Sequence, residues 1–345
     1  MRILSVVGAR PQFVKAAVVS RALTDEGIAE TLVHTGQHHD ARMSEIFFDE
    51  LGLPPPAHNL GIHGGHHGEM TARMLTGVEK IILADRPDCV LVYGDTNSTL
   101  AGALAAAKLH VPVAHVEAGL RSFNRRMPEE INRLLTDHIS TLLFCPTKVS
   151  VANLANEGVT AGVHLAGDVM MDATLAAKKI AESHSPILAT LGLAEGGYSL
   201  ATIHRAENTD DAARLKEIVA WLQARAKTRP IVLPIHPRTR IALERNAVGS
   251  AGLRVIEPVG YLDMQRLLAG SVEVFTDSGG VQKEAYFHRK PCVTLREETE
   301  WVETIDAGWN RLWRGPDYRP RHEIDEYGGG TAARRIAQIL RDTAA

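Results

Sequence analysis

Ionisable side chains gather where apolar, β-branched segments of this 345-residue chain end. Each such segment predicts a strand, and the residues that follow are Arg10, Gln37, His38, Asp95, Glu117, His204, Arg205, His236 and Asp277. Helix capping explains single Asp or Ser residues at strand ends. It does not explain Glu and His recurring at several strand ends. We therefore expect a catalytic or binding site assembled from these side chains.

The segment TDSGGVQKEAYF (276–287) predicts an anion site. A strand ends at Asp277, and Ser278, Gly279 and Gly280 lead into a helix. The free N–H groups at a helix start bind anions, and glycines let a phosphate approach closely. Glu284 lies one turn into this helix and is placed to accept hydrogen bonds from vicinal hydroxyls, such as those of a ribose. An ordinary Gly-rich turn is the alternative.

The segment GARPQFVK (8–15) has a similar form, with a turn at Gly8 and Pro11 in the first turn of a helix. Arg10 and Lys15 add positive charge. This arrangement suits a second phosphate contact. Charges on the surface of an amphipathic helix are the alternative.

Acidic residues flank the basic segment RSFNRR (121–126). Glu117 ends an apolar strand, where a carboxylate needs a functional reason. Glu129 and Glu130 follow Pro128 at a predicted helix start, where acids are favoured in any case. Glu117 is therefore the stronger catalytic candidate, and Glu129 the weaker.

Several nucleotide and metal motifs are missing from the sequence. It has no GxGxxG fingerprint, no GxxxxGK[ST] loop, no GxSxG elbow and no DxD triplet. We expect diphosphate charge to be met by helix starts, Arg and His without an obligatory metal. The chain has 16 histidines, grouped at 34, 38, 39 and at 63, 66, 67, but the second group lies in a Gly-rich loop without helical spacing. We predict no metal site.

Strands and helices alternate along the chain, which predicts parallel sheets in a doubly wound α/β fold. The predicted strands are 3–8, 31–36, 89–95, 112–118, 141–146, 162–168, 199–205, 231–237, 253–258, 273–279 and 291–296. The pattern restarts near residue 168. We predict domains at 1–168 and 169–328, with a final helix in 329–345 packing back on the first domain. Ligands bind at the carboxyl ends of such strands, so we expect the site between the two domains.

Composition excludes several classes of protein. The net charge is −3, from 38 Lys and Arg against 41 Asp and Glu, which argues against binding nucleic acid or a membrane by bulk charge. No apolar run reaches the roughly 18 residues of a transmembrane helix. Three scattered cysteines suggest neither a disulfide framework nor a zinc finger, so we expect a cytoplasmic protein.

Six segments together resemble one enzyme family. GARPQFVK, VYGDTNSTLAG, HVEAGLRS, PEEINR, IHRAEN and TDSGGVQKEA, in this order, are similar to the non-hydrolysing UDP-N-acetylglucosamine 2-epimerases. The resemblance spans almost the entire chain. HTGQHHDARMSEIFF, GGHHGEMTARML and RSFNRRMPEEINR look most like the subgroup acting on UDP-2,3-diacetamido-2,3-dideoxy-glucuronate. It implies two Rossmann-like domains of the glycosyltransferase-B type.

The resemblance also implies a reaction. UDP is eliminated to leave a 2-acetamidoglycal and then adds back, with a proton delivered to the other face of C2; neither NAD nor a metal takes part. Asp95, Glu117, Glu129 and His204 match the catalytic positions of the family. We favour Asp95 and Glu117 at C2, with His204 and Glu129 near the leaving group or acetamido group, but the sequence does not separate these roles. The expected UDP and substrate contacts are Arg10, Lys15, Arg205, His236, Ser278, Gly279, Gly280 and Glu284.

The physiological substrate stays open between UDP-N-acetylglucosamine and the diacetamido uronate. A uronate carboxylate needs a further cation, which Arg125, Arg126 or a loop histidine offers. Gln37 and Arg73, with His38 nearby, match positions of a second, activating site, but Asp40 stands where that site has its second glutamine. A homodimer and a role in bacterial surface polysaccharide synthesis, such as lipopolysaccharide O-antigen, are family expectations. A glycosyltransferase of the same fold, a hydrolysing epimerase and a nucleotide-sugar sensor are the alternatives.

Overall fold

The computed structural model describes residues 1–37 and 51–343 and divides into two compact units. Unit 1 contains residues 1–173 and 325–345, and unit 2 contains residues 174–324. The division falls inside helix α7 (Val169–His184), a few residues beyond the predicted boundary at 168. The chain returns to unit 1 at residue 325, before the predicted 329.

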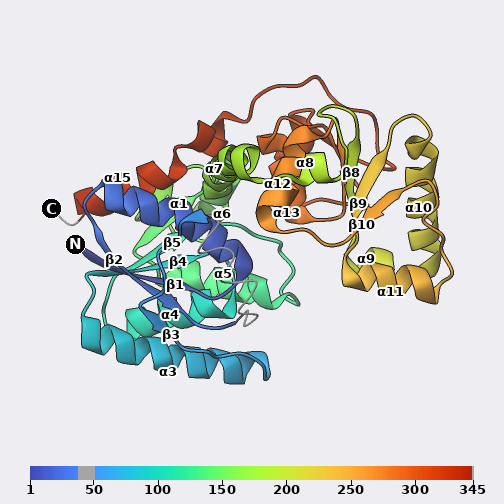
Figure 1. Cartoon of the computed structure of the whole chain (residues 1–345). Coiled ribbons are helices and arrows are strands. Elements are labelled where there is room, and N and C mark those ends of the chain that lie inside the picture. Colours follow the sequence, from blue (N-terminus) through green and yellow to red (C-terminus); the bar gives the residue numbers. More distant parts are fainter. Residues whose placement is uncertain (38–50, 344–345) are drawn as a thin grey trace. The chain divides into compact units, whose positions relative to one another are not determined.

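Unit 1 is built on a parallel seven-stranded sheet in the order β3-β2-β1-β4-β5-β6-β7 (Figure 1). The strands are β1 (Arg2–Val7), β2 (Ala29–His34), β3 (His58–Asn59), β4 (Cys89–Tyr93), β5 (Val113–Val116), β6 (Leu142–Cys145) and β7 (Val163–Leu165). The central strands are apolar and buried along their length, as expected for parallel strands covered on both faces. β3 was not predicted, because two residues carry no hydrophobic pattern.

Helices cover both faces of this sheet. They are α1 (Arg10–Asp25), α3 (His67–Asp85), α4 (Asn97–Lys108), α5 (Pro128–Ile139), α6 (Lys148–Asn156) and α15 (Ala332–Thr343), with a 3₁₀ turn at Asp325–Gly330. Figure 1 shows α1 and α15 on one face and α3 and α4 on the other. Val78 and Ile82 of α3 pack in one apolar cluster with Leu4 and Val92 of the sheet, which fixes the strands whose ends carry the predicted site.

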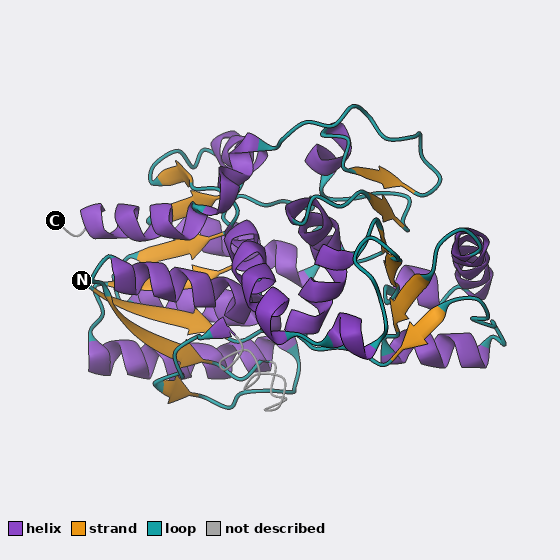
Figure 2. Ribbon diagram, turned by 45° about the horizontal axis from the view of Figure 1, so that its top comes forward, coloured by secondary structure: helices purple, strands orange, loops and turns teal. Residues whose placement is uncertain are grey.

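Unit 2 has a parallel six-stranded sheet in the order β10-β9-β8-β11-β12-β13. Figure 2 draws the strands of both units in orange and the helices in purple. The strands of unit 2 are β8 (Ser199–Thr202), β9 (Ile231–Pro234), β10 (Arg254–Ile256), β11 (Val274–Thr276), β12 (Cys292–Thr294) and β13 (Asn310–Leu312). Its helices, besides the end of α7, are α8 (Ile187–Thr190), α9 (Ala206–Thr209), α10 (Ala212–Ala226), α11 (Pro237–Arg245), α12 (Tyr261–Gly270), α13 (Gly279–Phe287) and α14 (Val302–Asp306). β13 was also not predicted.

Each sheet contains a point at which its strand order reverses. In unit 1 the reversal lies between β1 and β4, and in unit 2 it lies between β8 and β11. Open α/β sheets bind ligands beyond the strand ends at these points. Arg10 and Asp95 follow the first pair of strands, and His204 and Ser278 follow the second pair. Topology therefore places four of the predicted site residues at the two reversal points.

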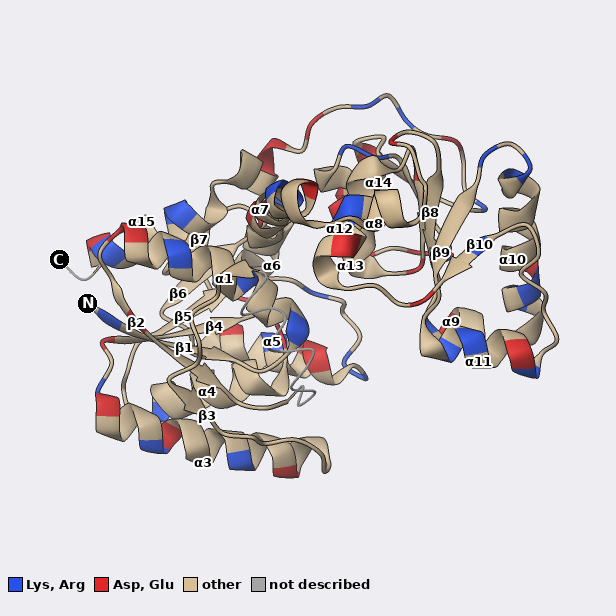
Figure 3. Ribbon diagram, viewed as in Figure 1, with Lys and Arg blue, Asp and Glu red and all other residues tan. Residues whose placement is uncertain are grey.

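Charge is mixed over the surface. Figure 3 shows both signs alternating along α3. Within residues 1–37 and 51–343, no helix is long and apolar enough to cross a membrane. Cys89, Cys145 and Cys292 are all buried and unpaired. Burial raises the pKa of the Cys89 and Cys145 thiols to about 12.

Candidate active site

The turn after β1 is fixed by a buried glutamine. Gln12 Oε1 accepts the N–H of Gly8 at 2.8 Å, and Gln12 Nε2 donates to the carbonyl of Tyr93 at 2.7 Å. A Cβ on Gly8 would lie 2.1 Å from Ser98 Oγ, so only glycine fits there. Gln12 thus joins the first turn of α1, which begins at Arg10, to the end of β4. Sequence reasoning missed Gln12, because nothing in the local sequence marks it as buried.

Glu117 follows β5 in a left-handed backbone conformation, with φ at +69°. Its side chain is 10% exposed and pairs with Lys15 of α1. Lys15, expected to contact phosphate, thus lies against a predicted catalytic carboxylate. A Cβ on Gly94 would lie 3.4 Å from Glu117 Oε2, so the turn after β4 also lies against this carboxylate. The carboxyl ends of β4 and β5 therefore share one charged cluster.

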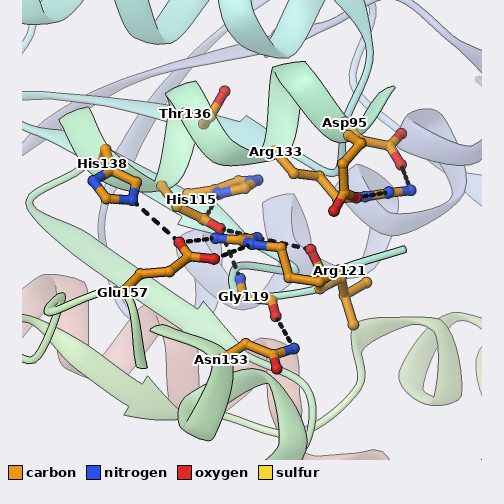
Figure 4. A network of polar contacts seen from close by, with 12 residues as sticks. Asp95, His115, Gly119, Arg121, Arg133, Thr136, His138, Asn153 and Glu157 are labelled. Carbon is orange, nitrogen blue, oxygen red and sulfur yellow. Dashed lines mark hydrogen bonds and ion pairs between the residues drawn. The ribbon is translucent and has the colours of Figure 1, made fainter. Parts of the chain in front are cut away.

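Asp95 is paired with Arg133 of α5. Arg133 Nη2 lies 2.5 Å from Asp95 Oδ2, and its Nη1 lies 2.9 Å from Glu130 Oε2 (Figure 4). Burial lowers the pKa of Arg133, but the two carboxylates outweigh burial and raise it. The guanidinium therefore bridges two acids as a permanent cation. Sequence reasoning missed Arg133; its only signal is the i, i+3 spacing from Glu130, which puts both on one helix face.

The buried acid at the start of α5 is Glu130. It is 1% exposed and accepts hydrogen bonds from Ser122 N–H and Phe123 N–H, each at 2.9 Å. These donors and Arg133 lower the pKa of Glu130 although burial opposes ionisation. Glu130 thereby fixes the loop before α5. Glu129, the predicted catalytic residue, is exposed on the first turn of α5, and its role stays a prediction.

Gln37 and Arg73, predicted for a second site or a sugar contact, each have hydrogen-bond partners of their own. Gln37 Oε1 accepts from Ser98 Oγ at 2.8 Å, which ties the end of β2 to the start of α4. Arg73 of α3 donates to the carbonyl of Gly64 at 2.9 Å. Arg126 is exposed in the loop before α5. His38 and Asp40 lie outside the described residues.

In unit 2, Asp277 fixes the turn that carries His204. Asp277 is buried and accepts the N–H of Arg205 at 2.9 Å and Asn208 Nδ2 at 2.9 Å, and its Oδ1 lies 3.2 Å from His204 Nδ1. Burial raises the pKa of Asp277, but His204 and these donors outweigh it, so the pKa lies below its ordinary value. His204 remains partly exposed, with its ring oriented by a buried carboxylate. That arrangement suits proton transfer or contact with an anion.

His236 begins α11, and its ring centroid lies 5.6 Å from that of His204. Its Nδ1 accepts the N–H of Arg238 at 3.2 Å, so in the neutral ring the proton is on Nε2. Desolvation and the charges of His204 and Arg238 lower the pKa of His236. A neutral imidazole with an exposed donor is suited to binding a phosphate oxygen.

The two glycines at the start of α13 serve different purposes. A Cβ on Gly279 would lie 2.2 Å from Glu300 Oε1, so this glycine makes room for Glu300. Gly280 is exposed, and a Cβ there would meet no atom closer than Ser278 Oγ at 4.0 Å. Ser278 Oγ caps the helix through the N–H of Val281. The approach open to a phosphate is therefore on the side of Gly280.

Glu284 is held by a buried chain of side chains. Its Oε1 accepts from Gln265 Nε2 at 3.1 Å, and Gln265 Oε1 lies 2.6 Å from His288 Nε2. Gln265 has its amide oxygen toward the imidazole N–H. Burial lowers the pKa of His288 to about 3, so the ring is neutral. A carboxylate fixed in this way, 8% exposed, is suited to accepting hydrogen bonds from two hydroxyls.

Comparisons with known proteins agree with these features. A family model for UDP-N-acetylglucosamine 2-epimerase matches residues 21–341. A relative from Pseudomonas aeruginosa, named UDP-2,3-diacetamido-2,3-dideoxy-D-glucuronate 2-epimerase, is 53% identical over 99% of both chains. The crystal structure of the Methanocaldococcus jannaschii UDP-GlcNAc 2-epimerase in complex with UDP-GlcNAc and UDP covers 100% of both chains with a TM-score of 0.85 and 42% identity. A UDP-GlcNAc 2-epimerase from Neisseria meningitidis, bound to UDP-GlcNAc, has a TM-score of 0.87 and 28% identity, over 99% of this chain and 100% of that one.

These likenesses confirm the predicted fold class, two Rossmann-like domains with parallel sheets of the glycosyltransferase-B type. They also extend over nearly all of the sequence, so they do not rest on a shared fold alone. The chain belongs to the UDP-N-acetylglucosamine 2-epimerase family.

Proposed function

We propose that this epimerase inverts C2 of UDP-2,3-diacetamido-2,3-dideoxy-D-glucuronate. The relative that carries this name is 53% identical, against 42% for the M. jannaschii protein named for UDP-N-acetylglucosamine. UDP-N-acetylglucosamine is the other substrate of the family, and each assay below compares the two UDP-sugars. A carboxylate at C6 distinguishes the uronate, and the exposed Arg125 and Arg126 before α5 are our candidates to bind it.

The proposed reaction is an elimination followed by an addition. A base removes the C2 proton, a C1–C2 double bond forms, and the C1–O bond breaks with its electron pair leaving on UDP. UDP then adds back to C1 of the 2-acetamidoglycal, and an acid protonates C2 on its other face. The C2–H bond has no adjacent carbonyl, so departure of UDP must develop as the proton leaves. Stabilising UDP and holding two proton-transfer groups are thus the two tasks of the protein.

One observation carries this proposal. Asp95 and Glu117 follow neighbouring parallel strands, and each carboxylate is paired with a different cation, Arg133 or Lys15. Two separately stabilised carboxylates are what protonation on two faces of one carbon requires. A glycosyltransferase needs only one base, so the second carboxylate would have no task. We assign Asp95 and Glu117 to C2.

Unit 2 is proposed to bind UDP. Its contributors are the start of α13 at Ser278, Gly279 and Gly280, the neutral His236, and Glu284 for the ribose. Arg205 and His204 add donors on the turn held by Asp277. Helix N–H groups stabilise the charge that grows on the departing diphosphate. Arg10, the first residue of α1, stays a predicted phosphate contact.

The setting of the reaction is also proposed. The three unpaired cysteines suit a reducing cytoplasm. A homodimer and a place in bacterial surface polysaccharide synthesis follow from the family. Size-exclusion chromatography with light scattering tests the dimer directly.

Isotope exchange tests the function. The protein is incubated with either UDP-sugar in D₂O and followed by NMR. We expect deuterium at C2 of intact UDP-sugar and a second epimer, with higher kcat/KM for the uronate. Free UDP with a reducing sugar would instead mean hydrolysis. No exchange until an acceptor is added would mean glycosyl transfer.

A pair of variants tests the assignment of Glu117. Glu117→Gln is expected to lower exchange at C2 by about 10²- to 10⁴-fold while UDP binding persists, because most of the proposed UDP contacts belong to unit 2. Glu129→Gln, on the exposed first turn of α5, is the matched comparison. Parallel loss of UDP affinity and exchange in Glu117→Gln would contradict the assignment.

A further inference from the structure

Asp137 of α5 is a buried carboxylate that the reaction proposed above does not use. It is fully buried and accepts three hydrogen bonds. His115 Nδ1 lies 2.7 Å from its Oδ1, while the N–H of Gly119 at 3.0 Å and Arg121 Nη1 at 2.7 Å both reach its Oδ2 (Figure 4). One of the three donors, Arg121, is a permanent cation, and hydrogen bonds to charged groups are the strong ones. The carboxylate therefore fixes the backbone segments that carry these donors.

The hydrogen bonds of His115 define its charge. Its Nδ1 faces the Asp137 carboxylate, and its Nε2 lies 2.7 Å from the carbonyl oxygen of Gly94. A carbonyl oxygen only accepts, so Nε2 must carry a proton. If Asp137 is ionised, Nδ1 must carry one as well. The geometry then makes His115, which is fully buried in β5, an imidazolium.

The neutral alternative would place the proton on Asp137 and leave Nδ1 as the acceptor. The other oxygen of Asp137 opposes this, because it already accepts from Arg121 and Gly119. Burial raises the pKa of Asp137, but His115 and Arg121 outweigh burial and bring it below its ordinary value. The partly exposed Glu157 also pairs with Arg121, at 2.7 and 2.8 Å, so Asp137 and Glu157 share this guanidinium.

Asp137 is connected through these donors to both turns that carry the proposed acid and base. Through His115 it holds the carbonyl of Gly94, the residue before Asp95. Through Gly119 it holds the turn that begins at Glu117. That turn needs such support, because Glu117 has a φ of +69°, which costs a non-glycine residue free energy and persists only where the surroundings impose it.

We propose that Asp137 is the positioning residue of this epimerase, which fixes the turns of Asp95 and Glu117 relative to each other through a cationic His115. The inference rests on the proposed function, since it takes those two carboxylates as the groups that exchange the C2 proton. Asp137 touches neither of them and acts only through its donors. Misplacement of a reacting group by about 1 Å lowers a rate roughly 10²-fold.

Steady-state kinetics test the positioning role. Asp137→Asn is expected to lower kcat by about 100-fold while KM and the affinity for UDP stay within about twofold of wild type. Thr136→Val is the matched control, because Thr136 is the neighbouring buried residue of α5 and its hydroxyl has no partner among the described residues. It should keep the wild-type kcat. A wild-type kcat in Asp137→Asn would overturn the proposal, and so would a parallel loss of UDP affinity.

Histidine NMR tests the charge of His115 without any reaction. With ¹⁵N-labelled histidine, we expect His115 to show a proton on both ring nitrogens in the wild type and on one in Asp137→Asn. A single ring proton in the wild type would overturn the proposal. Should Asp137→Asn fail to fold, His115→Gln takes its place in the kinetic test with the same expected loss of kcat, and a wild-type kcat there would overturn it equally.

Hydrogen exchange separates this inference from the function on which it rests. The backbone amides of residues 117–119 should exchange with solvent faster in Asp137→Asn than in the wild type. Their exchange rates in Thr136→Val should equal those of the wild type. If the wild-type protein exchanges no C2 hydrogen of either UDP-sugar with solvent, the proposed function fails. Amide hydrogen exchange and histidine NMR would still report whether Asp137 fixes the turn. Unchanged amide exchange in Asp137→Asn would overturn the positioning role.

Discussion

Asp95 and Glu117 are paired with cations of different kinds. Arg133 presents a planar fork that reaches Asp95 and Glu130 together, whereas Lys15 offers a single point charge to Glu117. The fork fixes the direction of Asp95 as well as its charge. The ammonium of Lys15 stabilises the ionised form of Glu117 and leaves its orientation to the turn. The two carboxylates are therefore held by different means.

Replacing the fork by a point charge tests this difference. Arg133→Lys keeps the positive charge but cannot bridge Asp95 and Glu130, so we expect kcat to fall at least about tenfold with little change in stability. The measurement is kcat and KM for both UDP-sugars. Arg21→Lys, an exposed residue of α1, is the control and should behave as wild type.

His288 predicts a pH dependence of stability. Its pKa is about 3 in the folded chain, because burial disfavours the charged form, and about 6.5 when unfolded. Between these values the unfolded chain binds more protons, so stability falls as pH falls, by at most about 1.4 kcal/mol per pH unit. Urea unfolding at pH 7, 6 and 5 measures this loss. His288→Gln should lose less stability over the same interval, and an equal loss in both proteins would contradict the assignment.

At the scale of elements, the backbone N–H groups at helix starts have two roles: at α13 they are proposed to bind phosphate, and at α15 they hold the helix to the rest of unit 1. α13 begins at Ser278 with its amides open toward Gly280, whereas the start of α15 is occupied by a side chain of the same unit. Asp172 of α7 accepts the N–H groups of Ala332 and Ala333 at 3.2 and 3.0 Å. Its pKa is raised to about 6, chiefly because it is buried. This contact ties α15 to unit 1.

Removing the Asp172 side chain should loosen α15. Asp172→Ala leaves two helix amides without an acceptor, which costs about 1–2 kcal/mol of stability. Asp172→Asn keeps an acceptor and removes a buried charge, so its loss should be smaller. Thermal unfolding and hydrogen exchange of residues 332–343 measure both effects. Equal losses in the two variants would show that charge, and not the acceptor, matters.

The elements that were predicted from sequence are those whose burial gives the sequence a recognisable run of apolar residues. The strands around β1, β4 and β8 appear as apolar runs because both of their faces are covered. β3 (His58–Asn59) has no apolar residue and β13 (Asn310–Leu312) begins with two polar ones, so neither forms an apolar run. The start of α13 was predictable because two glycines follow shortly after the end of a strand.

The site was predictable only in part. Asp95, Glu117 and His204 are detectable because ionisable residues rarely follow apolar strands. Gln12, Arg133 and Asp137 are not, because a buried polar residue in a helix has the same local sequence as an exposed one. Their partners lie 81, 38 and 22 residues away in the chain, so tertiary contacts alone identify them.

For the whole molecule, the two units have separate optical signals. All four tryptophans, Trp221, Trp301, Trp309 and Trp313, lie in unit 2. Tryptophan fluorescence therefore reports the unfolding of unit 2, whereas far-ultraviolet circular dichroism reports both units. Each unit has its own apolar clusters, so the chain need not unfold in one step.

UDP should stabilise the two units unequally. At about 100 times its Kd, a ligand bound to the folded form adds about 2.7 kcal/mol to the stability of the part that binds it. We expect UDP to move the fluorescence-detected urea midpoint upward and to split the circular dichroism transition in two. Phosphate at the same ionic strength is the control. An identical shift by both probes would mean that the units unfold together.

Because the three native thiols are buried, cysteines introduced at exposed positions can be labelled selectively. A thiolate is the reacting form, and burial keeps Cys89, Cys145 and Cys292 protonated, so maleimide dyes should leave the folded wild type unmodified. A cysteine placed at the exposed Lys80 of α3 and another at the exposed Lys216 of α10 would then be the reactive pair. Energy transfer between donor and acceptor fluorophores at these two positions would report the distance between the two labels, one molecule at a time.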